Sequence, residues 1–157
     1  MSGVTPEAIV HALHQIGVLI WVGSLFFVRL ILLPATGTAK APMARMRLRL
    51  GVYKQMFRWG WLGVLLVWGS GIWGLKALEL AALPIHVQVM VGIAAVMVLL
   101  HLIGYFAFFL NMDIAVEEAR LIRAAKNNYW MRKLLWLILI LGLAAAFLGA
   151  SGPYVLT

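Results

Sequence analysis

Long apolar stretches alternate with short polar ones along the chain, and their lengths predict four membrane-spanning helices. The apolar stretches cover residues 8–33, 59–78, 85–110 and 134–150. A helix needs about 20 apolar residues to cross the hydrocarbon core of a bilayer, with a range of about 17–25. We therefore predict an all-α integral membrane protein, with residues 1–157 forming a single four-helix membrane domain.

The composition supports this class and excludes several kinds of chemistry. Hydrophobic residues make up 64% of the chain and the mean hydropathy is +0.99, whereas soluble domains are about 45–50% apolar. Cysteine is absent, which excludes disulfides, thiolate metal sites, iron–sulfur clusters and cysteine nucleophiles. Ser24 and Ser70 are isolated in their spans, and packing of small residues explains them better than a nucleophilic role.

The basic residues predict the orientation in the membrane. The formal net charge is +8, and of 13 Lys and Arg residues only Lys76 falls near the side opposite the two basic connections at residues 35–58 and 111–133. By the positive-inside rule both connections lie in the cytoplasm and both termini in the periplasm of a bacterial inner membrane. Membrane lipid is then the partner that the charge predicts, and nucleic acid is not needed to explain it.

The third predicted span carries a stripe of histidine and methionine. His86, Met90, Met97 and His101 fall within a narrow sector when the segment is wound as a helix. A polar side chain inside a membrane is costly unless something pairs with it. The stripe is therefore expected to face the interior of the bundle or a bound cofactor.

The first predicted span carries the complementary candidates. His11 and His14 lie on adjacent turns of one face, and Arg29 lies on the same face near the far interface. A haem iron takes two axial ligands from facing helices at one depth, and His–His or His–Met pairs supply them. We predict a b-type haem between the two helices, with His14 or His11 on one side and His86 on the other, and with Arg29 neutralising a propionate.

Two features leave other kinds of site open. His101 lies about 22 Å below His86 along the helix axis, so it belongs to a second site or has another role. Copper is the alternative to haem, because His14, His86, Met90 and Met97 offer the imidazole and thioether ligands that suit Cu(I). Methionine on a buried face is also a common core residue.

An internal repeat is consistent with this arrangement. At an offset of 75 residues, His11 matches His86 and Gly17 matches Gly92. Such a repeat predicts two hairpins in the same orientation and places His11 opposite His86 near the periplasmic face.

Several stretches resemble a known superfamily of small membrane proteins. The run LHQIGVLIWVGSLFFVRLILLP, residues 13–34, resembles the first helix of the copper resistance protein D (CopD) family and of the related HemJ-type protoporphyrinogen oxidases. FRWGWLGVLLVWGSGIW, residues 57–73, and the Pro84-x-His86-x-x-x-Met90 opening are more similar to CopD. The resemblance implies a membrane bundle of four or more helices.

The HemJ resemblance further implies a b-type haem bound through His14. In that family the third helix typically reads His-x-Lys, and the lysine is implied for activity. The matching positions here are His86 and Gln88, so the residue that the resemblance implies for porphyrinogen oxidation is missing.

These features predict a haem-binding redox protein of the inner membrane. The haem would transfer electrons between a quinone or periplasmic donor and a redox partner protein, with quinone-linked or HemJ-like porphyrinogen oxidation as the enzymatic form. A CopD-type protein of copper transport or homeostasis and a non-catalytic accessory subunit remain the alternatives. The glycine-rich second span is compatible with a homodimer, but the sequence does not determine the oligomeric state.

Overall fold

The protein is all-helical over the residues that the structure describes. The computed structural model describes residues 5–75 and 83–155, and these contain no β-strand. The elements, in chain order, are α1 (Pro6–Phe27), the π-helical segment η1 (Val28–Leu32), α2 (Leu33–Ala35), the 3-10 turn η2 (Thr36–Thr38), α3 (Pro42–Leu75), α4 (Ile85–Ile103), the π-helical segment η4 (Gly104–Phe109), α5 (Leu110–Glu117) and α6 (Leu121–Val155). The predicted all-α class is confirmed.

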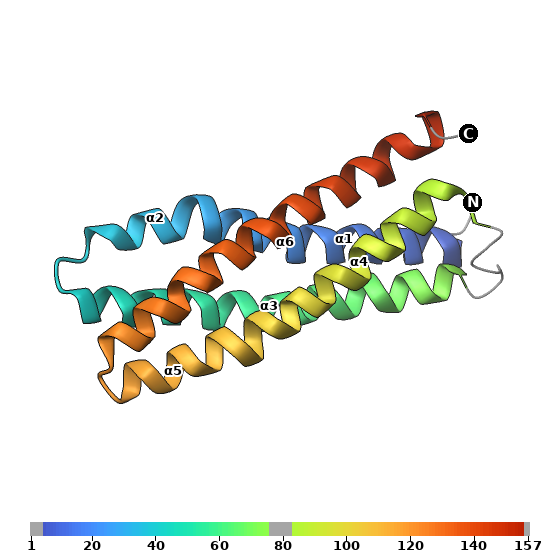
Figure 1. Ribbon diagram of the computed structural model, residues 1–157. Coiled ribbons are helices and arrows are strands. Elements are labelled where there is room, and N and C mark those ends of the chain that lie inside the picture. The colour runs from blue at the N-terminus through green and yellow to red at the C-terminus, as the bar shows by residue number, and fades with distance from the viewer. Residues whose placement is uncertain (1–4, 76–82, 156–157) are drawn as a thin grey trace.

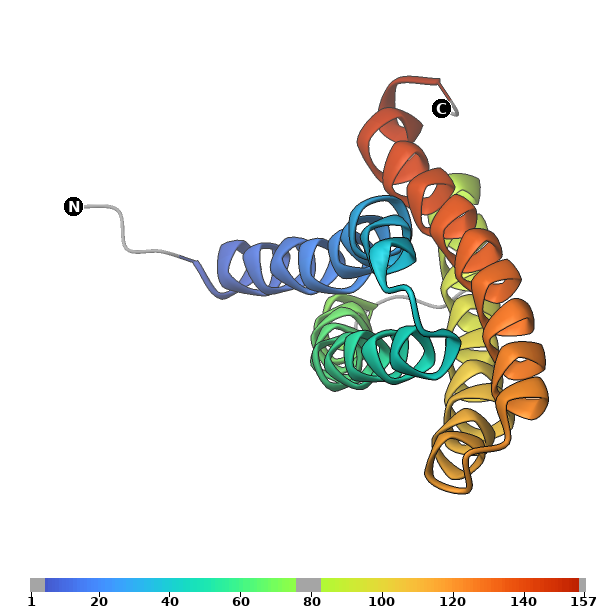
Figure 2. The ribbon, with the colours of Figure 1, turned by 90° about the vertical axis from the view of Figure 1, so that its left-hand side faces the viewer.

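The long helices form two hairpins that pack against each other (Figure 1). The first hairpin consists of α1, η1 and α2 followed by α3, and the second consists of α4, η4 and α5 followed by α6. Both tight connections, α2 to α3 and α5 to α6, lie at one end of the molecule, which we call the basic end. The view along the bundle shows the second hairpin tilted across the first (Figure 2).

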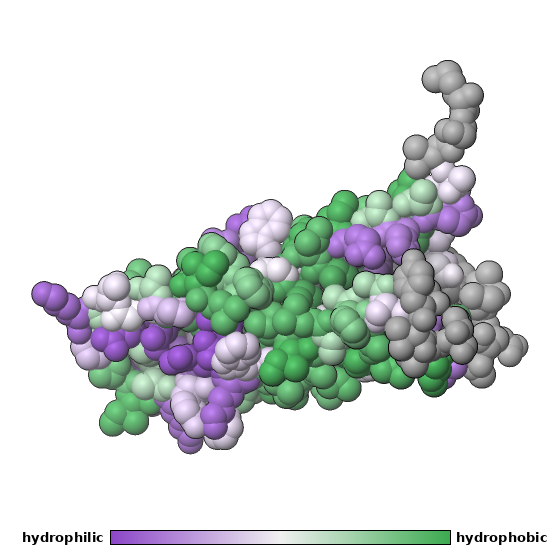
Figure 3. Space-filling model, turned by 90° about the horizontal axis from the view of Figure 1, so that it is seen from above, coloured by the Kyte–Doolittle hydropathy of each residue, from purple (hydrophilic) through white to green (hydrophobic). Residues whose placement is uncertain are grey.

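Three continuous helical segments are long and apolar enough to cross a membrane among the described residues: Pro6–Thr38, Ile85–Glu117 and Leu121–Ser151. The fourth predicted span, 59–78, falls largely on α3 and extends beyond the described residues, so its crossing stays a prediction. On the face shown in Figure 3, hydrophobic side chains cover the middle, and hydrophilic ones lie at the basic end and near the opposite end.

A π-helical segment interrupts each hairpin at a matching place. The segments η1 and η4 begin at residues 28 and 104, close to the 75-residue offset of the sequence repeat. A π segment shifts the helix register by one residue and often occurs where a helix has a functional role. The matching positions support the predicted repeat of two hairpins in the same orientation.

Two glycines bring α1 and α3 into close contact. A Cβ atom placed on Gly17 would lie 2.8 Å from Leu66 Cβ, and one placed on Gly63 would lie 2.7 Å from Trp21 Cβ. Small residues allow membrane helices to approach this closely. The turn between α5 and α6 is held differently.

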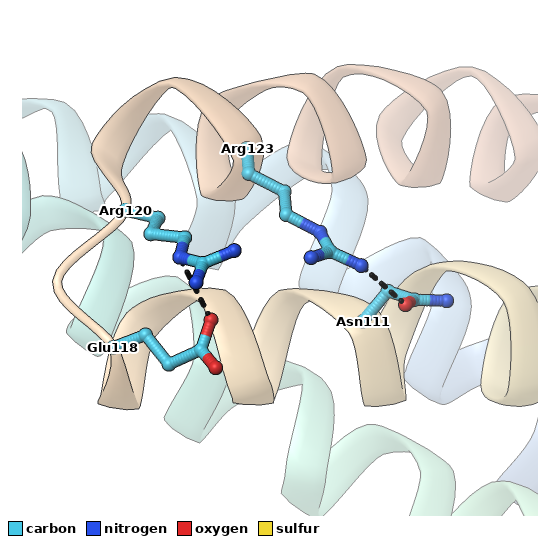
Figure 4. A network of polar contacts seen from close by, with 4 residues as sticks. All are labelled: Asn111, Glu118, Arg120 and Arg123. Carbon is cyan, nitrogen blue, oxygen red and sulfur yellow. Dashed lines mark hydrogen bonds and ion pairs between the residues drawn. The ribbon is translucent and has the colours of Figure 1, made fainter.

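At that turn Ala119 adopts a left-handed backbone conformation with φ of 55°. The exposed Arg120 Nε lies 3.0 Å from Glu118 Oε2, and Arg123 Nη2 donates to Asn111 Oδ1 over 3.3 Å (Figure 4). Exposed ion pairs of this kind stabilise by about 0–1 kcal/mol, so the turn depends mainly on its backbone geometry.

Candidate functional site

A cavity of about 740 Å³ lies between α1, α3, α4 and α6, in the half of the bundle away from the basic end. Small-molecule sites in proteins are typically about 300–1,000 Å³ and mostly apolar, so the volume suits a cofactor. The wall is formed mainly by Val, Ile, Trp, Ala and Gly. Its polar and sulfur-bearing side chains are Glu7, His11, His14, Gln15, Ser70, Met90 and Met97.

His14 is the best-defined potential ligand in this cavity. Its Nδ1 lies 3.1 Å from Ser70 Oγ, and the Ser70 hydroxyl donates to the carbonyl of Leu66. Because the only hydroxyl proton is used in that bond, Ser70 Oγ accepts from His14 Nδ1–H. The second ring nitrogen, Nε2, then carries a free lone pair, which is the state that a metal-binding histidine requires.

Met90 and Met97 reach the same cavity from α4 because α6 presents glycines opposite them. Met90 Cε lies 3.0 Å from the place where a Cβ of Gly149 would be, and Met97 Cε lies 3.1 Å from the corresponding place at Gly142. A larger residue at either glycine would displace the thioether.

His14 and Met90 both line the cavity, about two turns from a shared contact of α1 and α4 at Gly142. Val22 on α1 and Met97 on α4 both lie against the position that a Cβ of Gly142 would occupy. Both helices run from the same end of the bundle. At about 1.5 Å per residue, His14 lies about 12 Å from Val22 along α1, and Met90 lies about 10 Å from Met97 along α4.

The structure brings together only part of the predicted ligand set. His11 is exposed and lines the cavity with His14. His86 is buried, but it is not among the cavity-lining residues, and its Nδ1 has no hydrogen-bond partner within the described part of the chain. Pairing of His14 with His86 on one iron stays an untested prediction, and Met90 is the alternative ligand that the cavity wall offers.

His101 lies outside the cavity in a tightly packed aromatic environment. Its ring is 1% exposed and packs edge to face against Trp61 and Phe57, with centroid distances of 4.9 and 5.0 Å. A Cβ on Gly60 would approach His101 Cε1 to 2.8 Å. Neither ring nitrogen has a hydrogen-bond partner among the described residues, so the aromatic faces are the available acceptors for its N–H. A second cofactor here would require these rings to move.

Arg29 lies near the basic end rather than at the cavity. It belongs to η1, and its guanidinium carbon is 4.7 Å from the centre of the Trp136 ring. Arg29 is about 22 Å from His14 along the helix axis. Its predicted contact with a haem propionate stays a prediction that the cavity itself does not support.

The described residues include no group of three His, Cys, Asp or Glu side chains that could hold a metal ion. A metal in the cavity would therefore depend on His14 together with thioether sulfur or an organic ligand such as a porphyrin.

The contact of Ser70 with His14 is the feature of the candidate site that sequence reasoning missed. Ser70 lies 56 positions from His14, and nothing in its local pattern separates it from a packing serine.

Comparison of the chain with models of protein families, with curated proteins and with solved structures found no significant match. The CopD and HemJ resemblance therefore stays a prediction, and function is argued from the site.

Proposed function

We propose that this protein is a b-type haem-binding redox protein of the inner membrane, with haem held in the cavity through His14. The observation that carries the proposal is the bond between His14 Nδ1 and Ser70 Oγ, which leaves Nε2 free beside a cavity of about 740 Å³. A membrane histidine held in this tautomer by a neighbouring helix is arranged as a metal ligand.

The cavity residues fit a haem. Met90 lines the same cavity as His14, so His14 and Met90 are the residues that would hold the iron. Small residues such as Gly71 and Ala146 leave room between the helices, and most of the wall is apolar. When bound, haem supplies one-electron redox chemistry. The cavity residues would set the reduction potential of the haem, because ligation by His and Met and apolar surroundings both raise that potential.

Electron transfer is favoured over HemJ-like porphyrinogen oxidation. Gln88 occupies the position where the resemblance implies a lysine. The Gln88 amide donates to the carbonyl of Leu83 over 2.8 Å, and Gln88 does not line the cavity. In this function a quinone or a periplasmic donor would supply the electrons, and a redox partner protein would accept them.

The proposal includes four spans with the basic end in the cytoplasm and both termini in the periplasm. Apolar side chains that are exposed on α3, including Leu65 at 69%, support its crossing of the membrane beside α1. The basic residues of both tight connections support the orientation. The cavity would then lie in the periplasmic half of the bundle.

Copper binding is the second candidate, and the joint presence of His11, His14, Met90 and Met97 around one cavity favours it. Thioether and imidazole suit Cu(I). Successive ligands along a cavity wall would serve passage or delivery of the ion. An accessory subunit without cofactor is the third possibility.

One purification separates these functions. The protein is expressed with haem precursor and copper present, purified in mild detergent, and analysed for haem, copper and visible absorption. About one haem per chain with a Soret band supports the proposal. Copper without haem supports the second candidate. A preparation that contains neither haem nor copper overturns both proposals.

The second axial ligand is identified with two variants and a control. We expect Met90→Leu to convert a low-spin haem spectrum to a high-spin one, and His86→Ala to leave it unchanged. Met112→Leu is the matched control, because Met112 is fully buried outside the cavity. The opposite result, with His86→Ala alone changing the spectrum, would establish His–His ligation.

A further inference from the structure

Three arginines from three different elements approach one another near the basic end. Arg29 belongs to η1, Arg49 to α3 and Arg132 to α6. All three are half-buried. The only ion pair within the described ranges joins Arg120 to Glu118, so no described carboxylate neutralises any of the three.

The buried hydroxyl of Tyr53 marks where they meet. Tyr53 has no exposed surface and donates to Asn128 Oδ1 over 3.0 Å. Arg49 lies one helical turn before Tyr53 on α3, and Arg132 lies one turn after Asn128 on α6. Burial raises the pKa of the Tyr53 hydroxyl, and the nearby charges of Arg49, Arg132 and Arg29 act to lower it. Arg49 and Arg132 are thus each one turn from a partner in this hydrogen bond, and Arg29 stacks over Trp136, which is one turn from Arg132 along α6.

The protein holds the arginines in place but leaves some of their N–H groups without an acceptor among the described residues. Arg49 Nε donates to Thr36 Oγ1 over 2.9 Å, and Arg29 stacks over Trp136, one turn beyond Arg132. The Nε atoms of Arg29 and Arg132 are buried and have no acceptor within the part of the chain that the structure describes. Unpaired buried donors and mutually repelling charges are unfavourable unless an anion is bound.

The guanidinium groups of the cluster favour phosphate as the bound anion. The planar guanidinium fork matches phosphate oxygens with two parallel hydrogen bonds. The basic end lies, by the proposed orientation, at the cytoplasmic leaflet, where anionic phospholipids are concentrated. A lipid phosphate at that interface would lie at the height of the cluster.

We propose that Arg29, Arg49 and Arg132 form a binding site for a phosphate group, supplied by the headgroup of an anionic phospholipid. The site is independent of haem in the cavity. It differs from general attraction of the basic connections to lipid, because it depends on three particular guanidinium groups.

The test measures thermal unfolding of the purified, delipidated protein in neutral detergent. Phosphatidylglycerol, phosphatidylcholine or inorganic phosphate is added in separate series. We expect phosphatidylglycerol to raise Tm by several degrees, and Arg132→Gln to lose most of that shift. Arg47→Gln is the matched control, because Arg47 is an exposed arginine of α3 outside the cluster and should keep the full shift.

Each alternative has a distinct result. Equal losses in Arg132→Gln and Arg47→Gln would overturn the site in favour of diffuse surface charge. A full shift from inorganic phosphate alone would support the phosphate site and overturn the lipid as its source. Loss of bound haem with an unchanged lipid shift in Arg29→Gln would assign the cluster to a propionate and overturn the proposal.

Folding of the variants is checked by their Tm in phosphatidylcholine alone. If Arg132→Gln does not fold, Arg132→Lys, Arg29→Gln and Arg49→Gln provide the same comparison. The lysine variant keeps the charge but lacks the fork, so it should retain part of the shift.

Discussion

At the scale of single residues, His14 is set apart from the other three histidines by its partner on α3. Sequence periodicity placed it on the inner face of the first span, but could not predict its hydrogen bond to Ser70, since the two residues come from different helices. His101 shows the limit of the same reasoning. The histidine and methionine stripe predicted that it faces the interior or a cofactor, but it packs among aromatic rings outside the cavity.

Replacing Ser70 by alanine is expected to weaken haem binding about 10-fold, because outer partners of a metal-binding histidine typically contribute 10–100-fold to affinity. The measurement is titration of the cofactor-free protein with haemin. Ser24→Ala is the control, since Ser24 Oγ donates only to the carbonyl of Trp21 in its own helix. Equal affinities for both variants would show that the bond to His14 has no role in binding.

At the scale of elements, apolar length predicts where helices cross the membrane but not where they begin and end. The predicted span 134–150 is part of α6, which begins at Leu121. Intrahelical hydrogen bonds continue through polar residues at the membrane surface as readily as through apolar ones. The length of a hydrophobic segment therefore gives only a lower bound on the helix.

The contact between α1 and α3 gives a test at this scale. Gly17→Ala is expected to destabilise the protein by about 1–3 kcal/mol, because overpacking forces the helices apart. A Cβ at that position would lie 2.9 Å from the backbone nitrogen of Val67, which cannot give way as a side chain end can. Thermal or denaturant unfolding in detergent measures the change.

Gly23→Ala is the matched control on the same helix, since nothing lies within 4 Å of a Cβ placed there. Alanine is the better helix former by about 1 kcal/mol, so this variant should be neutral or slightly more stable. Equal destabilisation by both substitutions would contradict close packing at Gly17.

At the scale of the whole molecule, the tilt between the two hairpins explains why the stripe on α4 does not serve one site. Met90 and Met97 line the cavity, whereas His86 and His101 are buried elsewhere. A straight face on one helix meets different neighbours along its length when the hairpins cross (Figure 2). Periodicity predicts which residues point inward, and the packing of hairpins decides what each of them meets.

The orientation is tested by labelling single cysteines, which the chain allows because it contains none of its own. A membrane-impermeant maleimide is expected to label Ser151→Cys in cells whose outer membrane is permeabilised. Ala41→Cys, at the basic end, should react only after the inner membrane is broken. The reverse pattern would contradict a cytoplasmic basic end.

The most direct test of the proposed function is the reduced absorption spectrum of protein purified from haem-replete membranes, compared between the unchanged chain and His14→Ala. The account predicts a Soret band and a sharp α-band in the unchanged chain, with loss of both in the variant while Tm shows that it remains folded. A full spectrum in His14→Ala, or no haem in the unchanged chain, would contradict it.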